Sequence, residues 1–148
     1  MIAYKAPLQD MRFALYDVIG GEALFKKLAI GTAQRDIMDA VLEEGARFTE
    51  TVLSPLNPVG DQIGCVHDNS TGAVTTPPGF RDAFLKFVDG GWSGLTAPES
   101  MGGQDMPETL GAIMSATRTA TRRRFSMSAS LNMMGIAHSS PSLRTVTV

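Results

Sequence analysis

The stretch GGWSGLTAPESMGGQ, residues 90–104, contains five of the fifteen glycines and the single tryptophan, Trp92. It has no lysine, so it lacks the G-x-x-x-x-G-K-[ST] pattern of a phosphate-binding loop. It also lacks the G-x-G-x-x-G spacing after a strand that a dinucleotide-binding turn needs. Glycines permit tight backbone paths, and Trp92 and Leu95 are large enough to anchor such a path to a core. We therefore predict a packed connection between helices, in preference to a ligand loop or a flexible linker.

The segments on both sides of this connection have helical patterns. Before it, residues 79–91 repeat apolar side chains at helical spacing, and these are Phe80, Phe84, Leu85 and Val88. After it, Pro107 and Glu108 are residue types that favour the first turn of a helix. The connection is therefore expected to join a helix ending near residue 89 to one starting near residue 107.

Three further helices are expected nearer the N-terminus. The first covers residues 8–18, and the second covers residues 22–30 and ends at Gly31. The third runs from Thr32, as its N-cap, to about Leu53, with Gly45 weakening it by about 1 kcal/mol relative to alanine. The residues expected on its buried face are Ile37, Val41, Phe48 and Val52, and those expected on the outer face are mostly the acidic Asp36, Asp39, Glu43, Glu44 and Glu50.

The remaining segments are expected to be mostly irregular. Residues 54–65 contain two prolines, which disfavour helix at the preceding residue, so a loop is expected. One short extended piece is expected at residues 74–76, and residues 125–136 could form another helix. With five or six helices, almost no sheet and no internal repeat, the predicted fold class is an all-α helical bundle.

Composition excludes several classes of protein. Hydrophobic residues make up 43% and charged residues 19% of the 148 residues, which is typical of a globular chain. No stretch approaches the ~20 apolar residues of a membrane span, and the N-terminus has no secretory pattern, so a cytoplasmic location is the default. Cys65 is the single cysteine and lies near His67; an ordinary loop thiol is favoured over a metal site or a nucleophile.

The sequence around the glycine-rich connection resembles the N-terminal domain of the acyl-CoA dehydrogenase family. There a G-W-x-G-L element is followed by P-E-x-x-G-G-Q, and residues 91–104 match this pattern. YKAPLQDMRFALYDV, FTETVLSPLNPVGDQIGC, VTTPPGFRDAFLKFVDGGW and FSMSASLNM resemble the branch of 3-methylmercaptopropionyl-CoA dehydrogenases. The resemblance covers residues 3–134 and weakens at 115–124. It implies an N-terminal helical extension at residues 1–34, a family-like helical domain at residues 35–134 and a divergent tail at residues 135–148.

The resemblance implies FAD-dependent α,β-dehydrogenation of acyl-CoA thioesters, with electrons passed to an electron-transfer flavoprotein. The middle β domain and the C-terminal helical domain of the family are absent from this sequence, and with them the catalytic glutamate. No catalytic residue is assigned, no metal is expected, and flavin binding by the chain alone is in question. The residues expected to face the acyl and flavin pocket are Phe125, Met127, Ser128 and Leu131, although ordinary helix core is the alternative reading of them.

The charge distribution is uneven. Residues 1–117 contain eight Lys or Arg and all fifteen acidic residues, whereas residues 118–148 contain five arginines and no acid. Four of these arginines lie in residues 118–124, where the family pattern is lost, and a solvated basic patch is expected there rather than a nucleic-acid interface. Translation of the gene in a shifted reading frame would also produce these losses of the family pattern. An inactive enzyme fragment is therefore the first hypothesis. The alternatives are a translated gene remnant and a helical interaction module that docks onto full-length relatives or uses its basic tail on an acidic partner. Self-association into a homo-oligomer is a separate expectation for the chain.

Overall fold

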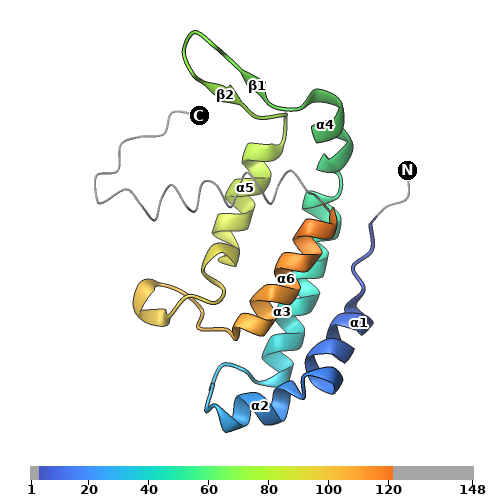
Figure 1. Cartoon of the computed structure of the whole chain (residues 1–148), viewed down its shortest axis with the longest axis vertical. Coiled ribbons are helices and arrows are strands. Elements are labelled where there is room, and N and C mark those ends of the chain that lie inside the picture. The colour runs from blue at the N-terminus through green and yellow to red at the C-terminus, as the bar shows by residue number, and fades with distance from the viewer. Residues whose placement is uncertain (1–3, 122–148) are drawn as a thin grey trace.

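The computed structural model describes residues 4–121 and is built mostly of helices, with one two-stranded sheet (Figure 1). This confirms the all-α prediction, while residues 122–148, with the expected helix at 125–136, lie outside the described part. The elements are α1 (Leu8–Arg12), the π-helical turn η1 (Phe13–Val18), α2 (Gly21–Lys27), α3 (Arg35–Phe48), the π-helical turn η2 (Thr49–Leu53), α4 (Leu56–Ile63), β1 (Val66–His67), β2 (Val74–Thr75), α5 (Phe80–Asp89), the 3-10 turns η3 (Trp92–Gly94) and η4 (Glu99–Met101), and α6 (Glu108–Thr121).

Helix α3 lies at the centre of the bundle. It contacts α1 and α6, and its continuation η2 contacts α6 and α4. In Figure 1, α6 lies in front of α3, with α1 and α2 beside and below them. The main core is formed where these elements meet, and its buried members are Met11, Leu15, Phe25, Met38, Leu42, Leu95, Leu110 and Met114.

The buried face of α3 is shifted from the predicted one. Met38, Leu42 and the continuation residue Leu53 are fully buried, whereas Ile37 is 36% exposed and Val41 is only half-buried. Two apolar stripes lie side by side on this helix, and the sequence pattern does not show which one faces the centre. The stripe that starts at Met38 is covered from two sides, by α1 and by α6, and is therefore the buried one.

The beginning of α3 also differs from the prediction. The helix starts at Arg35, and Gln34 occupies the N-cap position without a side-chain hydrogen bond. The Thr32 hydroxyl instead donates a 2.7 Å hydrogen bond to the Asp105 carbonyl. The preceding helix ends at Lys27 rather than at Gly31, and Ala29 adopts a left-handed φ of 56°. Thr32 therefore ties this turn to the start of α6 instead of capping α3.

The prediction of a loop at residues 54–65 is wrong, because Leu56–Ile63 forms helix α4. Pro55 occupies the N-cap, and Pro58 lies in the first turn, where a backbone N–H would have no partner inside the helix. Both prolines are thus compatible with the helix. It ends at Gly64, whose φ of 68° favours glycine.

The extended piece at residues 74–76 is confirmed as β2, which pairs antiparallel with β1, Val66 opposite Thr75. Helix α5 is confirmed, but its buried residues are Phe80, Ala83 and Phe87, whereas Leu85 and Val88 are exposed. The helix packs on Leu53 in a second, smaller core. Its inner stripe is therefore rotated from the one expected, for the same reason as in α3.

The shifted face of α3 predicts unequal effects of two substitutions. Leu42→Ala should lower the free energy of unfolding by about 2–5 kcal/mol, because it opens a cavity in a fully buried site. Ile37→Ala should cost less than about 1 kcal/mol, because its side chain is already partly in water. Urea unfolding followed by circular dichroism measures both. Equal losses would contradict the observed orientation of α3.

Candidate functional site

The glycine-rich connection between α5 and α6 is a folded unit closed by its own backbone. Hydrogen bonds run from the N–H of Gln104 to the Gly94 carbonyl (3.0 Å), from Asp105 to Ala97 (2.9 Å) and from Met106 to Leu95 (3.0 Å). They join the second half of the connection to the first. This confirms the packed connection predicted from the sequence.

The glycines of this connection are needed for conformation and for space. Gly91 and Gly102 have left-handed φ values of 72° and 79°, which side chains other than hydrogen disfavour. A Cβ atom on Gly103 would overlap the backbone carbonyl of Ala97. The Gly91 carbonyl also accepts a 3.0 Å hydrogen bond from the Gln104 side chain.

Trp92 and Leu95 anchor the connection, as the sequence predicted. Leu95 is 6% exposed, and the half-buried Trp92 packs against the main core. The ring of Trp92 lies 6.2 Å from that of Phe48, which in turn lies 6.3 Å from that of Phe87. These tilted rings join the connection to α3 and α5.

A hollow of about 270 Å³ lies between this connection and α6. Apolar side chains form one part of its wall and hydroxyl groups the other. Its lining residues are Phe87, Trp92, Ser93, Leu95, Thr96, Glu108, Gly111, Ala112, Met114 and Ser115. Glu108 is the one ionisable residue among them, so the lining does not offer a set of metal ligands.

The hollow does not fit FAD. A flavin dinucleotide carries a pyrophosphate, which proteins bind with backbone N–H groups at a helix N-terminus or with Lys and Arg. At the N-terminal end of α6 the lining instead presents the carboxylate of Glu108, and it includes no cationic side chain. The lining of this hollow therefore supplies no phosphate cradle for this cofactor.

The other candidate residues do not form a site in the described part of the chain. Cys65 is exposed, and His67 Nδ1 lies 2.9 Å from Asn69 Oδ1. Within residues 4–121, no three His, Cys, Asp or Glu side chains are placed to hold a metal ion. The residues expected to face the flavin pocket, Phe125, Met127, Ser128 and Leu131, lie outside the described residues.

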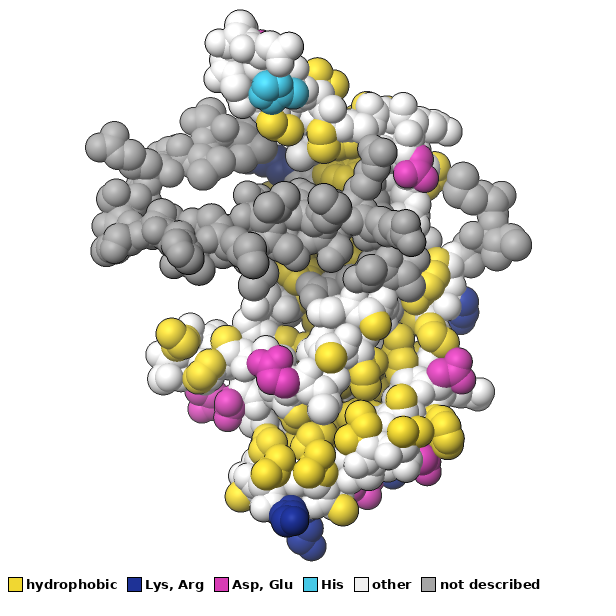
Figure 2. All heavy atoms as spheres, viewed as in Figure 1, with side chains coloured by type: hydrophobic (Ala, Val, Ile, Leu, Met, Phe, Trp, Pro, Cys, Tyr) yellow, Lys and Arg dark blue, Asp and Glu magenta, His cyan; other side chains and the backbone are white. Residues whose placement is uncertain are grey.

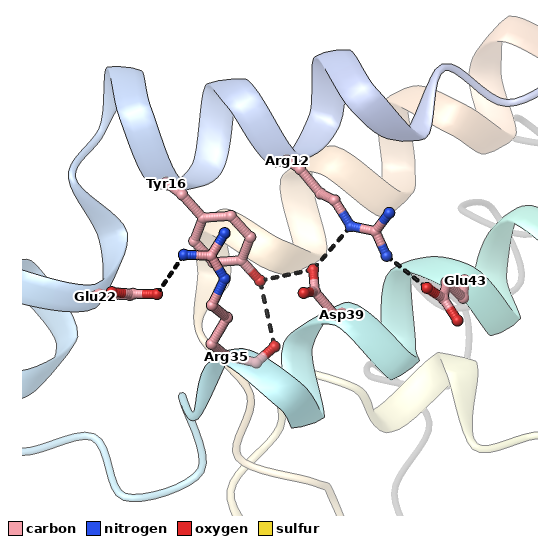
Figure 3. A network of polar contacts seen from close by, with 6 residues as sticks. All are labelled: Arg12, Tyr16, Glu22, Arg35, Asp39 and Glu43. Atoms are coloured by element: carbon pink, nitrogen blue, oxygen red, sulfur yellow. Dashed lines mark hydrogen bonds and ion pairs between the residues drawn. The ribbon is translucent and has the colours of Figure 1, made fainter.

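A polar network joins the N-terminal helices to α3 (Figure 3). Arg12 pairs with Asp39 at 3.0 Å and also with Glu43, while Arg35 pairs with Glu22 at 2.7 Å. The Tyr16 hydroxyl donates to Asp39 at 3.0 Å, and the Arg35 guanidinium lies 4.3 Å from the centre of the Tyr16 ring. The acidic face of α3 was expected to be an outer face, whereas part of it is covered by these helices.

Two of these contacts have electrostatic consequences. Burial, followed by the hydrogen bond to Asp39, raises the pKa of Tyr16 to about 12. Further along, Glu50 accepts a 2.9 Å hydrogen bond from the Ala6 N–H and pairs with Lys5 at 3.2 Å, and the Ala6 bond chiefly lowers its pKa. Most of these groups are partly exposed, so the network orients the N-terminal helices more than it stabilises the fold.

Comparison with known proteins gives two informative matches, although no family profile matches the chain. The 3-methylmercaptopropionyl-CoA dehydrogenase of Ruegeria pomeroyi is 32% identical over 111 residues, which are 75% of this chain. A broad-specificity linear acyl-CoA dehydrogenase of Mycobacterium tuberculosis is 28% identical over 115 residues, 74% of this chain. The two matches support the acyl-CoA dehydrogenase family.

The chain corresponds to a small part of these relatives, because each match spans 18% of the relative's own length. Among residues 4–121, no helix has the length and apolar character needed to cross a membrane. The matches support the family for this segment.

The crowding around Gly103 predicts that Gly103→Ala lowers the free energy of unfolding by about 1–3 kcal/mol, because the new methyl group overlaps a backbone atom. Gly31→Ala is the matched control, since a Cβ there meets nothing within 4 Å. Thermal unfolding of both variants gives the comparison. A Gly103→Ala protein as stable as Gly31→Ala would contradict the tight path.

The polar network predicts that the Tyr16 hydroxyl ionises at a higher pH than a free tyrosine does. Because its pKa is raised from 10.0 to about 12 in the folded state, its contribution to stability is complete below pH 10 and is lost as the pH rises through 12. Asp39→Asn should shift this pKa towards 10, though not fully, since burial is the larger cause. Phenolate absorbance in a Tyr4→Phe background measures it, and Asp36→Asn, an exposed acid on the same helix, should leave it unchanged.

Proposed function

We propose that this chain is the N-terminal helical domain of an FAD-dependent acyl-CoA dehydrogenase. The observation that carries the proposal is that two acyl-CoA dehydrogenases match about three quarters of the chain, which is mostly helical where it is described. In the intact family, bound FAD would supply the oxidation of an acyl-CoA thioester between its α- and β-carbons. The cofactor supplies the redox chemistry and the protein positions the substrate.

Three parts follow in this proposal. Residues 1–34 are an N-terminal extension, residues 35–134 are the domain itself, and residues 135–148 are a divergent tail. Phe125, Met127, Ser128 and Leu131 face the acyl and flavin pocket of the intact enzyme. Electron-transfer flavoprotein accepts the electrons, and the enzyme acts in the cytoplasm.

The chain alone is inactive in this proposal. The hollow next to the glycine-rich connection carries a carboxylate and no cation, so it offers no site for the flavin pyrophosphate. The part of the family that supplies the base and most of the flavin contact lies beyond the sequence segment that is matched. The role of the described helices is to place α6 and the residues that follow it.

A non-catalytic interaction module is the second candidate. Several large apolar side chains in the described part are well exposed, among them Phe13 (60%), Val18 (68%) and Leu28 (58%). Exposed apolar side chains mark interaction sites where they gather into a patch. This reading keeps the fold and replaces catalysis with binding.

Exchange of the matched segment tests the first proposal. The Ruegeria pomeroyi enzyme, with its matched segment replaced by the corresponding residues of this chain, should retain bound FAD and oxidise its acyl-CoA substrate. Reduction of an electron-accepting dye measures the activity. The unmodified chain, given FAD, acyl-CoA and the same dye, should show no turnover.

A matched control separates misfolding from a wrong assignment. The same chimera with Leu42→Ala should be less stable and lose flavin at a lower temperature than the first chimera. A chimera that is folded by circular dichroism but neither binds FAD nor turns over substrate would refute the domain equivalence. Turnover by the unmodified chain would refute the claim that it is inactive alone.

A further inference from the structure

We draw no further inference here: the strongest candidate, the apolar surface patch exposed over the N-terminal elements η1 and α2 (Figure 2), carries no proposal, because nothing in the structure shows what covers it.

Discussion

The close approach of α3 to α6 is the constraint on which the rest of the structure depends. A Cβ atom on Gly45 would overlap the terminal methyl of Met114 and would lie 3.3 Å from the Trp92 ring. A glycine inside a helix costs about 1 kcal/mol of intrinsic propensity, and the sequence shows only that cost. In the structure this cost is offset, because the missing side chain lets Met114 and Trp92 pack directly on α3. The connection, the main core and the position of α6 all follow from this contact.

The polar side of α3 binds the N-terminal helices, and this contact depends on the packing of α6 on the other side of α3. Once α6 covers one side of α3, the N-terminal helices cover another, and the carboxylates of Asp39, Glu43 and Glu50 meet Arg12 and the Lys5–Ala6 segment. These contacts are largely exposed and individually weak. The apolar residues Met11, Leu15 and Phe25 supply most of the attachment, while the polar contacts set its register.

Helices and their connection were predictable from the sequence because periodicity, glycine and proline act locally. The buried face of each helix and its capping residue were not predictable, because they depend on which distant segments pack against the helix. Met38 and Ile37 are both apolar, and contact with α1 and α6 decides which of them is buried. Threonine is a favoured N-cap residue, yet the Thr32 hydroxyl donates its hydrogen bond to the carbonyl of Asp105, 73 residues away. Pro58 breaks a helix in the interior but not in a first turn, and the sequence did not show where α4 begins.

The candidate site was the least predictable feature, and the reason is physical. The flavin-facing residues were expected in the segment after α6, whereas the described bundle contributes support, a hollow with one carboxylate and the exposed face of α6. A helix buried on Leu110, Met114 and Thr117 yet bare at Ala112 and Ala116 leaves apolar surface in water unless something covers it. The sequence could not show this exposed face, because which side of α6 is buried depends on its packing against α3 and η2.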